Sequence, residues 1–368
     1  MSKAAELAAL IGGQKALGNK NFIINGGFQV WQRGTTADTA TSGDYMCDRF
    51  LVGFSGLDGN VDWDQETSTP DGHNYALKVS TDASESSLDA GDFLRVEHRL
   101  EGQNLQLLQK GTSSAKSVTL SFWVKSSVAS TYTVALEDRD TSSFREIGKS
   151  YVINSANTWE HKTVTFEGDT VGALDNDNAY SLGLYFWIDA GSTYTSGTFS
   201  TAWQARDTDE RVYDTTGWLV STSPQFYLTG VQLEIGDVAT PFEHEPFGIV
   251  EQKCQRYYFH TYRRGIAIGS TGTDNGAAYS RATGSTDVSN HPNLVIVYPT
   301  PMRTTPTLKF YSLAGTVDRI SHTGTGFSHV TNDSVTAVYE MGERGIHGLS
   351  ISGGEPIIAA HVTADAEL

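Results

Sequence analysis

Alternation of apolar and polar side chains is the feature that most constrains how this chain folds. It is clearest at residues 117–124, where Val118, Leu120, Phe122 and Val124 fall on one side of an extended backbone. Successive side chains of a strand point to opposite faces of a sheet, so this period of two predicts a strand with one buried face. The same pattern recurs at residues 132–136, 159–166, 180–188 and 226–233.

The order of these strands predicts two β-domains. Short β-branched and aromatic runs divided by Gly, Ser, Asn and Asp indicate an antiparallel, jelly-roll-like β-sandwich over residues 21–246. Strands expected at residues 265–268, 294–298, 307–311, 334–339 and 357–362 form a smaller C-terminal β-domain over residues 261–368. The spacing of Val250, Cys254 and Tyr257 predicts a linker helix over residues 247–260. The fold class is therefore all-β.

Two further segments of the sandwich carry specific expectations. Residues 21–34 are expected to open it as an apolar strand that Gly26 and Gly27 interrupt. The long polar segment 189–225 is expected to cross the sandwich surface, because Trp203, Tyr213 and Trp218 can pin it there.

Residues 1–20 form a separate N-terminal segment. Ala4, Leu7, Ala8 and Ile11 have the spacing of one helical face, and Gly12 ends the pattern. Helices shorter than about 12 residues are marginal in water, so this one needs a partner. We expect it to bundle with copies of itself or to dock on another protein, the alternative being a frayed tail.

Charge and composition exclude several classes of partner. The 368 residues carry a formal charge of −17, which argues against nucleic acid and against anionic lipid. No run approaches the roughly 20 apolar residues of a membrane helix, and the N-terminus lacks the apolar core of a signal peptide. Cys47 and Cys254 have no metal-ligand spacing and are expected to be buried free thiols.

Motifs of catalysis and cofactor binding are missing from the sequence. It has no G-x-S-x-G elbow, phosphate-binding loop or H-E-x-x-H, so we expect no enzyme activity, no cofactor and no metal centre. Glu137, Asp138 and Asp140 are interpreted as a solvated hairpin tip in preference to an acid/base pair. Residues 175–178 begin like a calcium loop, but Ala179 replaces a ligand; we interpret them as a turn and leave a structural calcium ion open.

Aromatic side chains give the positive indication of ligand binding, because sugars stack on indole and phenol rings through their C–H faces. The glycan-binding candidates are Trp63, Trp123, Tyr185 and Trp187. For each of them core packing is the competing interpretation, since large aromatic side chains are mostly buried.

An ordered set of segments resembles one known family. The segments are residues 24–34, 45–50, 95–102, 118–125, 228–236, 239–243, 253–258, 302–306 and 364–368. They resemble the β-sandwich module of tailed-phage and prophage tail or tail-fibre proteins, a fold akin to carbohydrate-binding modules. The resemblance implies a virion protein that works as an oligomer, and it carries no list of ligand residues.

The leading hypothesis is a non-enzymatic virion structural protein, a tail fibre or tail-associated appendage made in the host cytoplasm. Its N-terminus would attach to other virion proteins, copies of the chain would assemble as a homotrimer, and the β-domains would face the host surface. The alternatives are a glycan-binding receptor-recognition protein and a capsid decoration protein. A polysaccharide depolymerase is less favoured, because the chain has no regular β-helical repeat.

Overall fold

The structure of the protein is a computed structural model. It describes residues 20–271, 276–281, 294–323, 331–339, 341–346, 348–351 and 357–368. The predicted N-terminal helix, with Ala4, Leu7, Ala8 and Ile11, lies outside the described residues.

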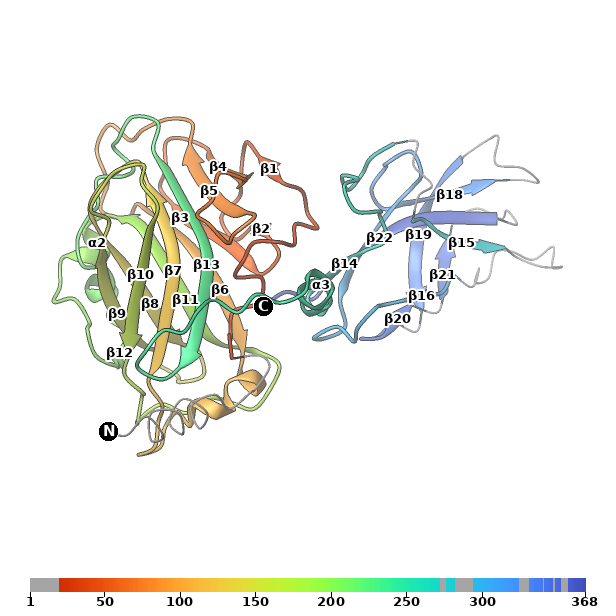
Figure 1. The fold of residues 1–368 in the computed structure, drawn as a ribbon. Coiled ribbons are helices and arrows are strands. Elements are labelled where there is room, and N and C mark those ends of the chain that lie inside the picture. Colours follow the sequence, from red (N-terminus) through yellow and green to blue (C-terminus); the bar gives the residue numbers. More distant parts are fainter. Residues whose placement is uncertain are drawn as a thin grey trace.

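Two antiparallel sheets form a β-sandwich (Figure 1). Sheet A has the order β1 (Thr36–Ala37), β4 (Val61–Glu66), β5 (Ala76–Thr81), β13 (Gln225–Ile235), β7 (Val118–Ser126) and β10 (Glu160–Phe166). Sheet B has the order β12 (Gln204–Ala205), β9 (Arg145–Val152), β8 (Thr131–Asp138), β11 (Tyr180–Ala190), β6 (Phe93–Glu101), β3 (Phe50–Ser55) and β2 (Tyr45–Cys47). The all-β class is confirmed.

The core lies between the two sheets. Leu120, Phe122 and Val124 of β7 face inward as their alternation predicts, and each is 0% exposed. Phe122 meets Phe186 of β11 edge-on, with ring centroids 5.1 Å apart. Burying one such ring contributes roughly 2–3 kcal/mol, so a period-two pattern on both sheets is enough to hold the layers together.

The opening segment is not the strand that its apolar residues predict. Residues 20–34 contain a turn and no strand, with Asn25 at φ 64° and Phe28 at φ 52°. The Asn25 side chain accepts hydrogen bonds from the backbone N–H groups of Gln29 and Val30, in competition with a sheet ladder. Phe28 is nevertheless 0% exposed, so this turn still buries an aromatic side chain in the sandwich.

The long segment after β11 does cross the outside of sheet B. It contains α2 (Ser192–Thr195), β12 and the 3-10 turn η3 (Thr208–Glu210). Trp218 is buried in the main core, and Trp203 Nε1 donates to the Glu167 carbonyl at 2.7 Å, so these two pin the segment as expected. The Tyr213 ring is instead 52% exposed.

Helix α3 (Phe247–Gln255) leads from the sandwich to the C-terminal β-structure (Figure 1). The predicted helix was too long, because residues 258–260 form strand β14 (Tyr258–His260). The strand expected at residues 265–268 was wrong, since those residues lie in turns. The division into domains at these boundaries stays a prediction.

Strand β22 (Ile357–Asp365) is the central strand of the C-terminal sheet. It pairs with β14, β15 (Ala278–Arg281), β17 (Thr307–Tyr311) and β18 (Arg319–Thr323). Strand β18 pairs with β19 (Thr331–Tyr339), which pairs with β21 (Gly348–Ile351). Strands β16 (Ile296–Val297) and β20 (Gly345–Ile346) form a separate ribbon. The second core includes Phe310, Ile320 and Val362.

Candidate ligand-binding face

The outer face of sheet A is set by the alternation along β7. Because Phe122 and Val124 point into the core, Trp123 and Lys125 point to the outside of the sandwich. The strand register places Trp123 opposite His161 of β10 and Lys125 opposite Tyr227 of β13. Side chains from three neighbouring strands therefore meet on one surface.

Aromatic rings dominate this surface. The ring centroids of Trp123 and His161 are 5.2 Å apart, and those of Trp159 and Tyr227 are 6.1 Å apart. Trp123 and Trp159 are partly exposed, whereas Tyr227 is 6% exposed and lies beneath its neighbours. We call Trp123, Lys125, Trp159, His161 and Tyr227 the aromatic face.

Lys125 brings a positive charge to the aromatic face. Its Nζ lies 3.9 Å from the ring centre of Tyr227 and 5.1 Å from that of Trp159. Burial lowers the pKa of Lys125, while the charge of Glu66 acts in the opposite direction. Within the described part of the chain Lys125 makes no ion pair, so its N–H donors remain open to a ligand.

Gly230 of β13 leaves room for the rings of His73 and Trp123. It has φ 61°, and a Cβ atom there would come within 2.6 Å of His73 Cε1 and 3.2 Å of Trp123 Cδ1. A break in the β13–β7 register lies between Thr229 and Gln232. Glycine is thus required both by the backbone conformation and by the rings that cover it.

Three more rings extend the aromatic face toward residues 242–244. Phe242 lies 5.2 Å from His73 and 4.9 Å from His244, measured between ring centroids. Burial lowers the pKa of His73 to about 4, with further lowering from His244 and His161. His73 is therefore neutral at physiological pH and adds a ring to the surface without a charge.

The four glycan candidates from the sequence occupy different environments. Trp63 lies in the core at 5% exposure, and Tyr185 and Trp187 lie under the 191–217 segment at 2% and 1% exposure. Trp123 is the member of this set on an open surface. Trp159 and Tyr227 were missed, although the alternation of β10 and β13 could have placed Tyr227 beside Lys125 had the register been known.

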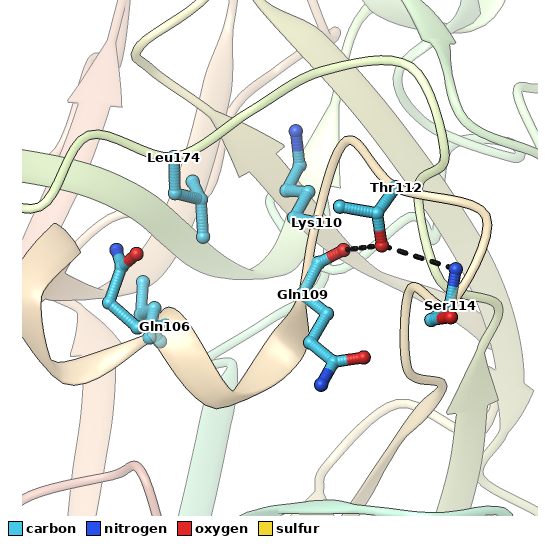
Figure 2. Close-up of a pocket in the computed structure, with 7 residues that line it drawn as sticks. Gln106, Gln109, Lys110, Thr112, Ser114 and Leu174 are labelled. Atoms are coloured by element: carbon cyan, nitrogen blue, oxygen red, sulfur yellow. Dashed lines mark hydrogen bonds between the residues drawn. The ribbon is translucent and has the colours of Figure 1, made fainter.

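A separate hollow of about 350 Å³ lies at one end of the sandwich (Figure 2). Its lining comes from the 3-10 turn η2 (Gln106–Leu108), which follows η1 (Gly102–Asn104), and from the loops around Lys110 and Leu174. Thr112 Oγ1 donates to the Gln109 carbonyl at 2.7 Å and accepts from the Ser114 N–H. Lys110 is neutralised by Asp138 and Asp169, so the hollow offers a ligand amide and hydroxyl groups but no free charge.

The carboxylates at the end of β8 are not a solvated hairpin tip, which corrects the sequence interpretation. Glu137 and Asp138 are both 0% exposed. Arg211 joins Glu137 to Glu146, with Nη2 and Nε donating at 2.7 and 2.9 Å. This arrangement anchors the 191–217 segment to sheet B, which is why these acids are buried.

Other features bear on metals, thiols and membranes. Among the described residues no group of three or more His, Cys, Asp or Glu side chains could hold a metal ion. Cys47 and Cys254 are free and buried, as expected. In the part of the chain that the structure describes, no helix is long and apolar enough to span a membrane.

Known proteins share only a general likeness of fold with this chain. No protein-family model matches the chain, and no curated protein matches it. Solved structures with a similar fold include the enzymatically active domain of tailspike protein 4 of bacteriophage CBA120, with 11% identity and a TM-score of 0.31. The match covers 59% of this chain and 22% of that one, so the chain spans less than a quarter of the tailspike domain's length.

Two carbohydrate-binding modules are also similar in fold. A family 61 module in complex with β-1,4-galactotriose has 10% identity and a TM-score of 0.30, covering 59% of this chain and all (100%) of that one. The family 11 module of a cellulosomal cellulase from Clostridium thermocellum has 15% identity and a TM-score of 0.28, covering 56% and 100%. The β-sandwich itself rests on the strand pairing of this chain.

Proposed function

We propose that this protein is a non-enzymatic virion component of the tail-fibre kind, whose sandwich contacts host-surface glycan through the aromatic face. The aromatic face is the observation that carries the glycan part of the proposal. Trp123 and Trp159 are partly exposed on a strand-supported surface, and Lys125 supplies N–H donors between them. Rings with exposed faces and an adjacent donor suit a sugar, whose C–H groups stack while its hydroxyl groups accept hydrogen bonds.

A structural role is supported by the junction between the sandwich and the C-terminal sheet. Residues 366–368 follow the central strand β22 and return to the sandwich, where Glu367 pairs with Arg33 and Arg49. The C-terminus accordingly lies beside α3 and the sandwich (Figure 1). A junction with buried ion pairs resists bending. Such stiffness suits an appendage that must hold its outer domains at a fixed place relative to the particle.

The non-enzymatic part of the proposal rests on how the acids are used. Glu137 and Glu146 are enclosed and committed to Arg211, and Asp138 is committed to Lys110. Incubation with host capsule or lipopolysaccharide tests this part. Released oligosaccharide would favour a depolymerase instead.

Glycan binding is tested with the full-length assembled protein on an array of bacterial surface glycans. Trp123→Ala and Trp159→Ala are each expected to weaken binding about tenfold, the typical loss for one stacking ring. Tyr213→Ala is the matched control, since Tyr213 is 52% exposed on the 191–217 segment, which covers the opposite sheet. Absence of any bound glycan, or equal binding by all variants, would overturn the glycan proposal.

The position of the protein on the virion is tested separately. Antibody labelling of intact virions in the electron microscope should mark the tail. Labelling over the capsid shell would favour a decoration protein, and mass measurement of the full-length chain tests the proposed trimer.

A further inference from the structure

Sheet B carries a second surface, of opposite character, on the other side of the sandwich. The outward positions of β6 hold Arg95, Glu97 and Arg99, with side chains 16%, 4% and 27% exposed. Arg139 and Arg206 lie across β11 from them, at 30% and 29%. Since neighbouring strands are about 4.8 Å apart, Arg99 of β6 and Arg139 beyond β8 are separated by roughly 10 Å.

Aromatic rings space these guanidinium groups. Tyr180 lies between Arg99 and Arg139, with ring centre to Cζ distances of 5.1 and 5.3 Å. Phe144 lies between Arg139 and Arg206, at 4.0 and 4.6 Å. We call Arg99, Tyr180, Arg139, Phe144 and Arg206 the arginine row.

Phe144 adopts an unusual backbone conformation to occupy this place. Its φ is 46°, in the left-handed region that bulky residues avoid. The turn is fixed by hydrogen bonds from Phe144 N–H to the Thr141 carbonyl at 2.8 Å and from Arg206 N–H to the Phe144 carbonyl at 3.1 Å. Strain of this kind is kept where the surroundings determine one geometry, and here it holds a ring between two cations.

Positive charge exceeds negative charge among the groups in direct contact. The five guanidinium groups are those of Arg95, Arg99, Arg139, Arg206 and Arg211, and they pair with three side-chain carboxylates, Glu97, Glu137 and Glu146. Arg99 Nη1 also donates to the Leu368 main-chain oxygen. The whole chain has a formal charge of −17. The local charge on this surface is therefore opposite in sign to the net charge of the whole chain.

Hydrogen-bond donors are left over at the exposed end of the row. Arg139 and Arg206 each donate to Glu137 through Nη1, and in the described part of the chain neither uses Nη2. A guanidinium has five N–H donors in a planar fork that matches a carboxylate or sulfate. The guanidinium groups of Arg139 and Arg206 both pair with the Glu137 carboxylate, and their remaining N–H groups face solvent.

We propose that the arginine row binds an acidic polysaccharide, with Arg139 and Arg206 holding an anionic group through their unused N–H donors, whereas Arg99 is occupied by Glu97 and the Leu368 main-chain oxygen. Guanidinium forks recognise carboxylate and sulfate oxygens, and Tyr180 and Phe144 fix the spacing between them. This site lies on the opposite sheet from the aromatic face and does not depend on it. At physiological salt, screening over about 8 Å limits repulsion by the acidic remainder of the chain.

The test uses the full-length protein with three probes of equal length: oligogalacturonate, a sulfated oligosaccharide and a neutral galactan oligosaccharide. Binding is measured by calorimetry at two salt concentrations. The wild type is expected to bind an acidic probe and to lose affinity as salt rises. The carboxylated and sulfated arms show which anion is preferred.

Variants locate the site. The double variant Arg139→Gln and Arg206→Gln is expected to lose at least about tenfold in affinity for the acidic probe, the loss typical of charge-assisted hydrogen bonds. Arg264→Gln is the matched control, because Arg264 also lies over a phenylalanine ring, 3.9 Å from that of Phe247, and pairs with Glu251. The double variant with lysine at 139 and 206 keeps the charges and the pairing with Glu137, so it folds as the wild type does but binds more weakly.

Three results would overturn the proposal. They are absence of acidic-probe binding by the wild type at low salt, unchanged affinity in the double glutamine variant, and self-association of the wild type that the glutamine variant abolishes. Trp123→Ala with Trp159→Ala must leave acidic-probe binding unchanged, which separates this site from the aromatic face.

Discussion

Arg49 and Glu367 form a buried ion pair between the sandwich and the end of the C-terminal sheet, although 318 positions separate them in the chain. Their side chains are 1% and 6% exposed, and the Arg49 guanidinium lies 3.5 Å from the centre of the Tyr257 ring. Burial raises the pKa of Glu367 in spite of Arg49, which means that desolvation of this carboxyl outweighs the attraction. The pair is therefore more useful for fixing one arrangement than for adding stability.

Breaking one side of this pair should be costly. Glu367→Ala leaves Arg49 buried with an unpaired charge, and we expect a loss of about 3–5 kcal/mol in the free energy of unfolding. Urea unfolding measures it. Replacing both residues by methionine should recover much of the loss, and a double variant as unstable as Glu367→Ala would contradict this account.

The pair Glu137 and Glu146 should make stability depend on pH. Burial raises the pKa of Glu146 to about 7, with the charge of Glu137 adding to the effect, whereas Arg211 and two further arginines lower the pKa of Glu137 in spite of its burial. A carboxyl whose pKa is raised in the folded state keeps its proton there while the unfolded chain loses it. Its contribution to stability is present below about pH 4.5 and is lost as pH rises to about 7.

Glu146→Gln removes that titration and keeps an acceptor for Arg211 Nε. Relative to the wild type, the variant should gain on the order of 1–3 kcal/mol between pH 5 and pH 8. Urea unfolding at both pH values measures the gain. Parallel pH profiles for the two proteins would show that Glu146 titrates normally.

Substitution of Gly230 should destabilise the protein for a steric reason, in addition to the positive φ of the backbone there. Gly230→Ala places a methyl group against His73 and Trp123, and we expect it to cost about 1–3 kcal/mol and to alter Trp123 fluorescence. Gly217→Ala is the control, because Gly217 has φ 72° but no atom within 4 Å of the added Cβ. Equal losses in the two variants would remove the steric explanation.

The strands could be predicted from the sequence, but which outer face of the sandwich is exposed and which is covered could not. Trp123 and Trp187 both follow from alternation as outward residues, yet one is open and the other is covered by the 191–217 segment. Which outer face is covered depends on Arg211 reaching Glu137, a contact between residues 74 positions apart that no local pattern reveals. The Asn25 turn was missed for a related reason, since side-chain hydrogen bonds there replace the strand that its apolar neighbours favour.

Cys254 offers a direct report on the junction. It lies in α3 against Val30, it is 0% exposed, and burial raises the pKa of its thiol well above the ordinary value. Cys47 is equally buried, with its thiol pKa raised for the same reason.

Neither thiol is expected to react with a thiol reagent such as dithionitrobenzoate at pH 8 in the native wild type, and both should react after unfolding. In Glu367→Ala, Cys254 should become reactive while Cys47 stays protected if α3 opens locally, and mass spectrometry of the labelled peptides distinguishes the two. Labelling of both at one rate would mean that the sandwich and the junction open together.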